Sequence, residues 1–120
     1  MNAVLDTHIL IDYLNGVKAA KEEIDCYETV MISVITWMEV MVGVAEEEDS
    51  IVKAFLSRFV QIPVNPDVAE RAVAIRRQTR MRLPDAIIWA SAKSESALLV
   101  SRNSKDFPPD SPDVRMPYSI

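Results

Sequence analysis

Short apolar runs alternate along the chain with segments whose apolar residues recur at helical spacing. The short runs have the length and β-branched content of buried strands, and we predict strands at 3–6, 30–35, 60–64 and 97–100, with a last short strand within 114–120. We predict helices over 8–15, 18–27, 36–48, 50–59, 66–81 and 84–95. This alternation is typical of an α/β fold in which helices cover both faces of a parallel sheet.

Polar residues at the predicted helix starts have the chemistry of caps. Thr7 precedes the first helix, and a threonine at 36 with Glu39 three residues later matches the capping-box pattern. Asn65 followed by Pro66 is a favoured start for the fifth helix. These features support the predicted boundaries.

Length and composition favour one small globular unit. The chain has 120 residues, of which 49% are hydrophobic and 26% charged, so we expect a single domain over 1–120. No apolar run is long enough to span a bilayer, and the N-terminus lacks the pattern of a signal peptide. The single Cys26 excludes an internal disulfide framework, and only His8 accompanies it as a soft metal ligand. We therefore expect a cytoplasmic protein without membrane association.

The overall charge argues against nucleic-acid binding, but one segment departs from it. The net charge is −5 and the isoelectric point is about 4.8, which repels nucleic acid on average. Residues 71–82 nevertheless contain five arginines and no acid. These arginines either complement the dipole at the end of their helix and pair with surface acids, or hold phosphate groups. We favour the first role for Arg71, whereas both remain open for Arg80 and Arg82.

Several acids and one amide fall where predicted strands end or predicted helices begin. They are Asp6, Glu39, Asp85, Asn103 and Asp106. Taken singly, these residues are explained as helix-start charges, a cap or loop acids. In a parallel sheet, however, the strand ends and helix starts share one edge, and ligands bind there where the strand order reverses. Carboxylates about 4 Å apart repel one another by about 4 kcal/mol at an effective dielectric of 20, which a divalent cation would relieve.

Four motifs in order give a family resemblance. "VLDTHILIDYL", "ISVITWMEVMVG", "LPDAIIWASA" and "LLVSRNSKDF" resemble the PIN-domain ribonucleases, in particular the VapC-type toxins of toxin–antitoxin pairs. The resemblance covers nearly the whole chain. It implies a three-layer α/β/α sandwich around a parallel sheet, Mg²⁺ or Mn²⁺ as cofactor, RNA as substrate, a homodimer, and a cognate antitoxin protein as partner.

The resemblance also implies roles for individual residues. Asp6, Glu39 and Asp85 fall on the acidic site positions of the family, and Thr7 matches the hydroxyl residue beside the first acid. By this resemblance, Asp6 and Asp85 hold the cation together with Asp106 or Asn103, and Glu39 orients the attacking water or accepts its proton. The basic segment, and not the resemblance, makes Arg80 and Arg82 candidates for RNA-phosphate contacts. The resemblance leaves open whether Asn103 or Asp106 completes the set, because many members carry an acid at the position of Asn103.

Other functions fit the sequence less well. A phosphorelay receiver needs an acceptor aspartate at the end of a central strand, but strand 60–64 is followed by Asn65 and Pro66. A haloacid-type phosphatase needs an aspartate two residues after the first, where this chain has His8. A more serious alternative is a PIN fold with weakened catalysis that acts as an interaction module, since Asn103 is neutral.

A partner or a second copy of the chain would need apolar surface. We expect this surface around Ile9, Tyr13 and Leu14, or at Trp37 and Met38. The net negative charge suits a basic partner that places a lysine or arginine among the acids.

Overall fold

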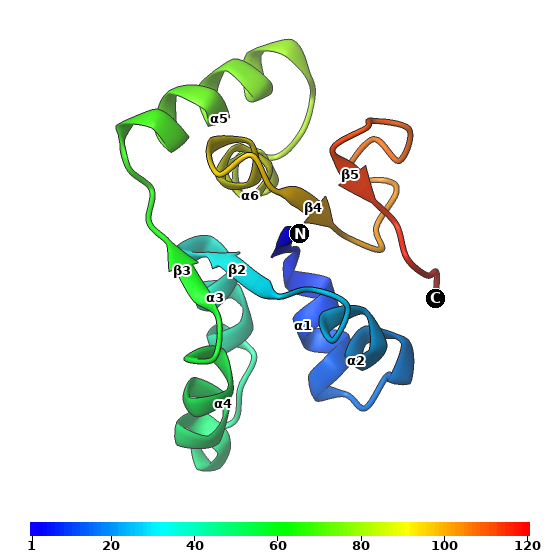
Figure 1. Ribbon diagram of the computed structural model, residues 1–120. Helices are drawn as coiled ribbons and strands as arrows, with labels where there is room; N and C mark the ends of the chain where they lie inside the picture. The colour runs from blue at the N-terminus through cyan, green and yellow to red at the C-terminus, as the bar shows by residue number, and fades with distance from the viewer.

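The computed structural model describes residues 1–120 and contains every predicted strand and helix, with changed ends (Figure 1). The strands are β1 (Asn2–Leu5), β2 (Thr29–Ser33), β3 (Val60–Ile62), β4 (Leu98–Val100) and β5 (Val114–Arg115). The helices are α1 (Thr7–Leu14), α2 (Lys18–Ile24), α3 (Val34–Val42), α4 (Asp49–Leu56), α5 (Pro66–Gln78) and α6 (Leu83–Ser94), with a 3₁₀ turn η1 (Glu46–Glu48) before α4. None of these helices is long and apolar enough to cross a membrane.

All five strands pair in parallel in one sheet, in the order β3-β2-β1-β4-β5. The chain runs outward from β1 through β2 to the edge strand β3 and then returns to β4 on the other side of β1. The strand order therefore reverses between β1 and β4, which is the position where parallel α/β sheets open a crevice at their carboxyl ends.

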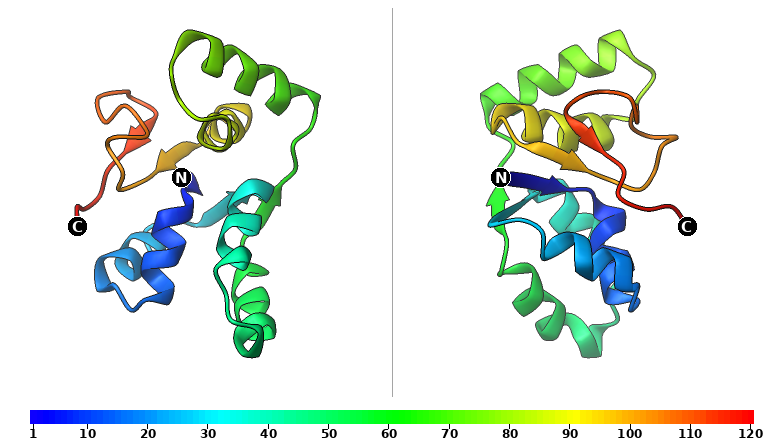
Figure 2. Two further views of the ribbon diagram at one scale, coloured as in Figure 1. Left: turned by 180° about the vertical axis from the view of Figure 1, so that it is seen from behind. Right: turned by 45° about the vertical axis from the view of Figure 1, so that its right-hand side comes forward.

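The two faces of the sheet are covered by different helices. In β1, Val4 packs with α5 and α6, whereas Ala3 and Leu5 pack on the other face with residues of α1, α2, α3 and α4. Figures 1 and 2 show α5 and α6 on one side of the sheet and the other four helices on the opposite side. The predicted α/β/α sandwich is confirmed, because strand side chains that point alternately to the two faces fill two separate cores.

Two predicted helix caps are wrong, and both errors concern candidate site residues. Helix α1 begins at Thr7 itself, and Asp6 occupies the cap position without a side-chain hydrogen bond to the helix. Helix α3 begins before the predicted capping box, and its cap is Ser33, whose Oγ accepts a hydrogen bond from the backbone N–H of Ile35 at 3.1 Å. Glu39 therefore lies in the second turn of α3 rather than the first. The carboxylates of Asp6 and Glu39 are both free of capping hydrogen bonds.

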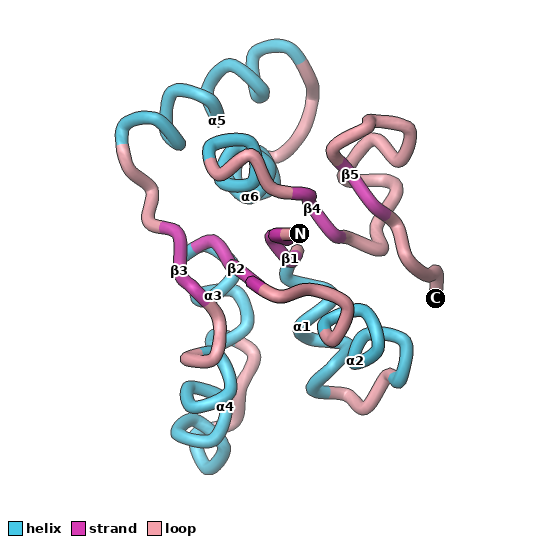
Figure 3. The backbone as a smooth tube through the Cα atoms, viewed as in Figure 1, coloured by secondary structure: helices cyan, strands magenta, loops and turns pink.

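The starts of α5 and α6 agree with the prediction more closely. Asn65 caps α5 by accepting a hydrogen bond from the backbone N–H of Val68 at 2.9 Å. Helix α6 begins at Leu83, one residue earlier than predicted, and Asp85 lies in its first turn as expected. The long connection over 101–113 is a loop, as Figure 3 shows, and it carries both candidates for the fourth site position.

Two buried acids pair with arginines and so tie the last third of the chain to α1 and α2. Asp12, which is 4% exposed, accepts hydrogen bonds from Arg102 at 2.8 and 3.2 Å and from the Tyr118 hydroxyl at 2.9 Å. Glu23, also 4% exposed, accepts hydrogen bonds from Arg115 at 2.7 and 3.0 Å. The pairing of Asp12 with Arg102 anchors the first residues of the loop after β4.

Candidate active site

A cavity of about 240 Å³, here called the acidic cavity, opens at the carboxyl edge of the sheet. Its lining residues are Asp6, Thr7, His8, Ile11, Glu39, Arg82, Asp85 and Asp106. The structure thus brings four carboxylates together from sequence positions as far apart as 6 and 106. They come from the end of β1, from α3, from the start of α6 and from the loop after β4.

Asp6 is held at the point where the strand order reverses. Its backbone N–H donates to the carbonyl of Val100 at 2.8 Å, which continues the pairing of β1 with β4. Its carboxylate, in a residue that is 1% exposed, accepts a hydrogen bond from the Ser101 hydroxyl at 2.9 Å and lies 3.3 Å from Nδ1 of His8. Asp6 directly follows β1 and Ser101 directly follows β4, so the first residue beyond each of these two paired strands takes part in the same hydrogen bond.

Thr7 positions Glu39. The Thr7 hydroxyl donates to Oε1 of Glu39 at 2.7 Å and lies 3.2 Å from the hydroxyl of the buried Thr36. The Thr7 hydroxyl therefore contacts two side chains of α3. This contact links the end of β1 to the middle of α3 and fixes one oxygen of the Glu39 carboxylate, so that the other oxygen is left for a ligand.

The pKa of Asp85 is strongly raised by its surroundings in the acidic cavity. The residue is 8% exposed and lies in the first turn of α6. Burial raises the pKa of Asp85 to about 6, and the negative charges of Asp106, Asp6 and Glu39 act in the same direction. The guanidinium of Arg82 opposes this shift without overcoming it. The repulsion among the acids is therefore larger than the attraction of the Arg82 guanidinium. A bound divalent cation would relieve this repulsion.

The loop after β4 distinguishes the two candidates for the fourth position. Asp106 lines the acidic cavity, whereas Asn103 does not. The Asn103 amide donates to Oδ2 of Asp106 at 2.7 Å, and its oxygen accepts a hydrogen bond from the backbone N–H of Lys105 at 3.1 Å. Both ends of the Asn103 side chain are thus used to shape the loop and to hold Asp106. The neutral residue therefore contacts the Asp106 carboxylate and does not itself line the cavity.

Sequence reasoning missed two residues of the site, Ser101 and His8, which both contact Asp6. The hydrogen bond with Asp6 raises the pKa of His8 above its usual value, in spite of partial burial. Ser101 is fully buried and also accepts a hydrogen bond from the backbone N–H of Asn103 at 3.1 Å. The strand-end rule that selected Asp6 would also have selected Ser101, because Ser101 directly follows the predicted strand 97–100.

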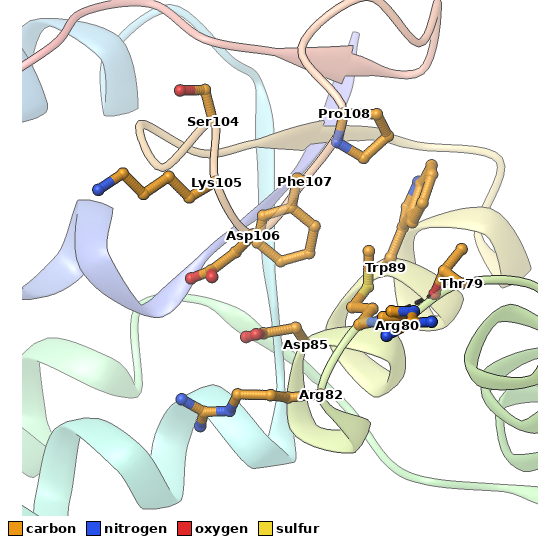
Figure 4. Close-up of a pocket in the computed structure, with 11 residues that line it drawn as sticks. Thr79, Arg80, Arg82, Asp85, Trp89, Ser104, Lys105, Asp106, Phe107 and Pro108 are labelled. Atoms are coloured by element: carbon orange, nitrogen blue, oxygen red, sulfur yellow. Dashed lines mark hydrogen bonds between the residues drawn. The ribbon is translucent and has the colours of Figure 1, made fainter.

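A larger cavity of about 480 Å³, here called the side cavity, adjoins the acidic one and shares Asp85, Asp106 and Arg82 with it. Residues 79–82 line one side, residues 104–108 line the other, and Trp89 completes the lining (Figure 4). Arg80 and Arg82 form no ion pair, while Arg71 pairs with Asp67 at 3.1 Å. The structural role that we favoured for Arg71 agrees with this pair.

The donor set fits a hydrated hard cation. No group of three His, Cys, Asp or Glu side chains stands close enough together to enclose a metal ion directly. Mg²⁺, however, keeps several waters and is commonly bound through one or two carboxylates, and Mn²⁺ also prefers oxygen ligands. Burial raises the pKa of Asp85, and the negative charge of the neighbouring acids, which adds to this shift, would favour such an ion.

Comparisons with known proteins agree with the fold. The PIN domain model matches residues 3–108, a range that contains all four carboxylates. Ribonuclease VapC19 of Mycobacterium tuberculosis is 32% identical over 124 residues, covering 96% of this chain and 98% of the relative. A toxin–antitoxin complex from Klebsiella pneumoniae contains a chain with 42% identity and a TM-score of 0.93, covering 98% of this chain and 99% of the other. DNA-bound VapBC from Salmonella typhimurium, at 24% identity and a TM-score of 0.79 over 96% of each chain, shares the fold.

Proposed function

Because the chain belongs to the PIN-domain family and, within it, to the VapC-type ribonucleases of toxin–antitoxin systems, we propose that its acidic cavity binds Mg²⁺ or Mn²⁺ and hydrolyses RNA phosphodiester bonds there. One observation carries the proposal: four carboxylates from distant parts of the sequence line one cavity where the strand order reverses. The alternative, a PIN fold with weakened catalysis, rests on the neutral Asn103; the Asp106 carboxylate in the acidic cavity supports the catalytic proposal.

The four acids have two kinds of role in the proposed reaction. Asp6, Asp85 and Asp106 hold the cation, directly or through its waters. When bound, the cation acidifies a water molecule and offsets negative charge on the phosphate. Glu39 orients the attacking water and accepts its proton, and the hydrogen bond from Thr7 keeps this carboxylate in place. The Asp106 carboxylate is held in a set orientation because Asn103 donates to one of its oxygens.

Arg80 and Arg82 are the proposed phosphate contacts. Both line the side cavity next to Asp85 and Asp106, and neither is neutralised by an acid in an ion pair. The chain has a net charge of −5, which repels RNA on average. Unpaired arginines in the side cavity would attract the RNA backbone to the region beside the carboxylates.

Cleavage of a fluorophore-quencher RNA library with Mg²⁺, with Mn²⁺ and with EDTA tests the proposal. We expect cleavage only with a divalent cation, and a decrease of at least about 100-fold in D6N and in D85N, since each removes a charged ligand. D110N changes an exposed loop acid outside both cavities and serves as the control. Cleavage by D85N at the parental rate would rule out the assigned role.

The proposed partner is a cognate antitoxin protein. A groove of about 560 Å³ lies between α1, α3 and α4, and it shares Ile11 and Glu39 with the acidic cavity. Leu14 and Ile51 line it and are 39% and 69% exposed. Ile9, which we expected on this surface, is fully buried, so that expectation is wrong. We propose that the antitoxin lays apolar side chains along the groove and inserts a lysine or arginine among the carboxylates.

Co-purification tests this partner. I51D should weaken the complex with the antitoxin while the isolated protein still cleaves RNA, because Ile51 lies in the groove but not in either site cavity. Unchanged binding by I51D would contradict the docking surface. A homodimer and a cytoplasmic location complete the proposal, and light scattering on the isolated protein measures the oligomeric state.

A further inference from the structure

We infer that the side cavity is a subsite for one unstacked nucleotide of the RNA next to the bond that is cleaved, and that Lys105 contacts the phosphate of this nucleotide. The inference rests on the proposed function and extends it from the carboxylates to the substrate beside them. It adds Lys105, Trp89 and the loop 104–108 to the residues that meet RNA.

The side cavity adjoins the acidic cavity. Asp85 and Asp106 line both cavities, so a phosphate at the carboxylates has its neighbouring nucleotide at the entrance to the side cavity. The volume of about 480 Å³ lies within the range of about 300–1,000 Å³ that small-molecule sites occupy. In Figure 4 the carboxylates of Asp85 and Asp106 point the same way, and Lys105 and Arg82 extend on either side of them.

Unpaired positive charge surrounds the side cavity. Each of the other four lysines forms an ion pair with an acid, whereas Lys105 forms none. Arg80 and Arg82, across the cavity, are also unpaired. A role for Lys105 in complementing a helix dipole does not apply, because it lies in the loop between β4 and β5. Three unpaired cations around one cavity favour an anionic ligand.

The apolar part of the lining suits a nucleobase. Met81 and the exposed edges of the largely buried Trp89 and Phe107 supply the hydrophobic surface of the cavity, and a nucleobase packs against apolar and aromatic surface of this kind. The Trp89 ring is held in place, because its Nε1 donates to Asp113 at 3.0 Å and the Lys93 ammonium lies 4.6 Å from its ring centroid. A base that is stacked between its neighbours in a duplex cannot reach this surface, so the subsite selects single-stranded RNA.

Binding to a fluorescein-labelled single-stranded RNA of random sequence, twelve nucleotides long, tests the inference by fluorescence anisotropy. EDTA prevents cleavage, so binding is read separately from catalysis. We expect K105Q and R80Q to raise Kd by about tenfold each, and to lower the slope of log Kd against log salt by about 0.7 for each phosphate that the variant no longer binds. The control is R76Q, which removes an exposed arginine of α5 that lines neither cavity, and it should bind like the parent.

Tryptophan fluorescence reports on the base itself. The chain has two tryptophans, so W37F leaves Trp89 as the only emitter. We expect single-stranded RNA to quench this emission, and a duplex of the same length to compete at least tenfold more weakly. Thermal unfolding of each variant verifies that it is folded.

The outcomes separate this inference from the proposed function. Metal-dependent cleavage by the parent, together with unchanged RNA binding in K105Q and R80Q, would overturn the subsite and leave the ribonuclease intact. Equal affinity for duplex and single strand would also overturn it. Weakened binding in K105Q and R80Q with no cleavage by the parent would support the binding site while the proposed hydrolysis fails.

Discussion

Replacing Asp85 by Asn should make the metal-free protein more stable and the enzyme inactive. Asp85 lies in the acidic cavity with three other carboxylates, and burial together with Asp106, Asp6 and Glu39 raises its pKa to about 6. The charged form is therefore disfavoured in the folded state relative to the unfolded chain. Asparagine keeps the shape of the side chain and removes this unfavourable charge.

The magnitude follows from the two pKa values. The usual value is 3.8 and the folded value is about 6, a difference that corresponds to about 3 kcal/mol when the group is fully charged. Water in the open cavity screens part of this repulsion, so we expect D85N to gain about 1–2 kcal/mol at pH 7.5. Between pH 4 and pH 6 the folded parent binds more protons than the unfolded chain, and its stability therefore falls as the pH rises. The gain in D85N should be near zero at pH 4 and complete above pH 7.

Urea unfolding followed by circular dichroism in EDTA measures this difference at pH 4, 5.5 and 7.5. Repeating the measurement with Mg²⁺ should reverse the order of the two proteins. A cation at 100 times its Kd stabilises the parent by about 2.7 kcal/mol, and D85N loses most of this gain. The parent is then the more stable protein, and only the parent cleaves RNA.

D110N is the matched control, because its carboxylate is exposed and lies outside the acidic cavity. We expect it to leave stability and cleavage unchanged. A metal-free D85N that is less stable than the parent at pH 7.5 would refute the reasoning, since the carboxylate would then be a stabilising group. A gain that is the same at pH 4 and pH 7.5 would show that ionisation is not its cause.

Three further substitutions test interactions around the site. R102A leaves the buried Asp12 without its cation and should lower the free energy of unfolding by about 3 kcal/mol in urea titrations; a decrease of less than about 1 kcal/mol would contradict this. S101A removes the hydrogen bond to Asp6 and should weaken Mn²⁺ binding by about tenfold in calorimetry, with the fold intact by circular dichroism; unchanged affinity would dismiss a positioning role. N65A removes the cap of α5 and should cost about 1 kcal/mol in thermal unfolding without changing RNA cleavage.

The architecture was predictable because strand and helix patterns repeat through the whole chain. Five apolar runs became five parallel strands, and the separation of Val4 from Ala3 and Leu5 onto opposite faces follows from the alternation of side chains in a strand. Helix boundaries were less predictable. Ser33 and Thr36 have similar capping chemistry, so the local sequence does not distinguish Ser33, which caps α3, from Thr36, which lies inside the helix.

The position of Glu39 shows why a correct residue can be selected for an incorrect reason. A capping box would have engaged the Glu39 carboxylate with the start of its own helix. The helix instead begins at Val34, and the carboxylate is left to accept the hydrogen bond from Thr7. This hydrogen bond joins residues 32 positions apart, so no local pattern around Glu39 could have predicted it.

The shape of the loop after β4 places Asp106, and not Asn103, in the lining of the acidic cavity. From the sequence, either Asp106 or the neutral Asn103 could complete the set, because both follow the strand that becomes β4. The loop turns back on itself through hydrogen bonds from the backbone N–H groups of Asp106 and Phe107 to the carbonyl of Asn103, at 3.2 Å each. The same turn brings the Asn103 amide to the Asp106 carboxylate. An amide can donate this hydrogen bond and a second carboxylate at position 103 could not, so N103D should push Asp106 out of its present place and weaken Mn²⁺ binding even though it adds a potential ligand. Tighter Mn²⁺ binding by N103D would instead show that charge at this position outweighs the support of the loop.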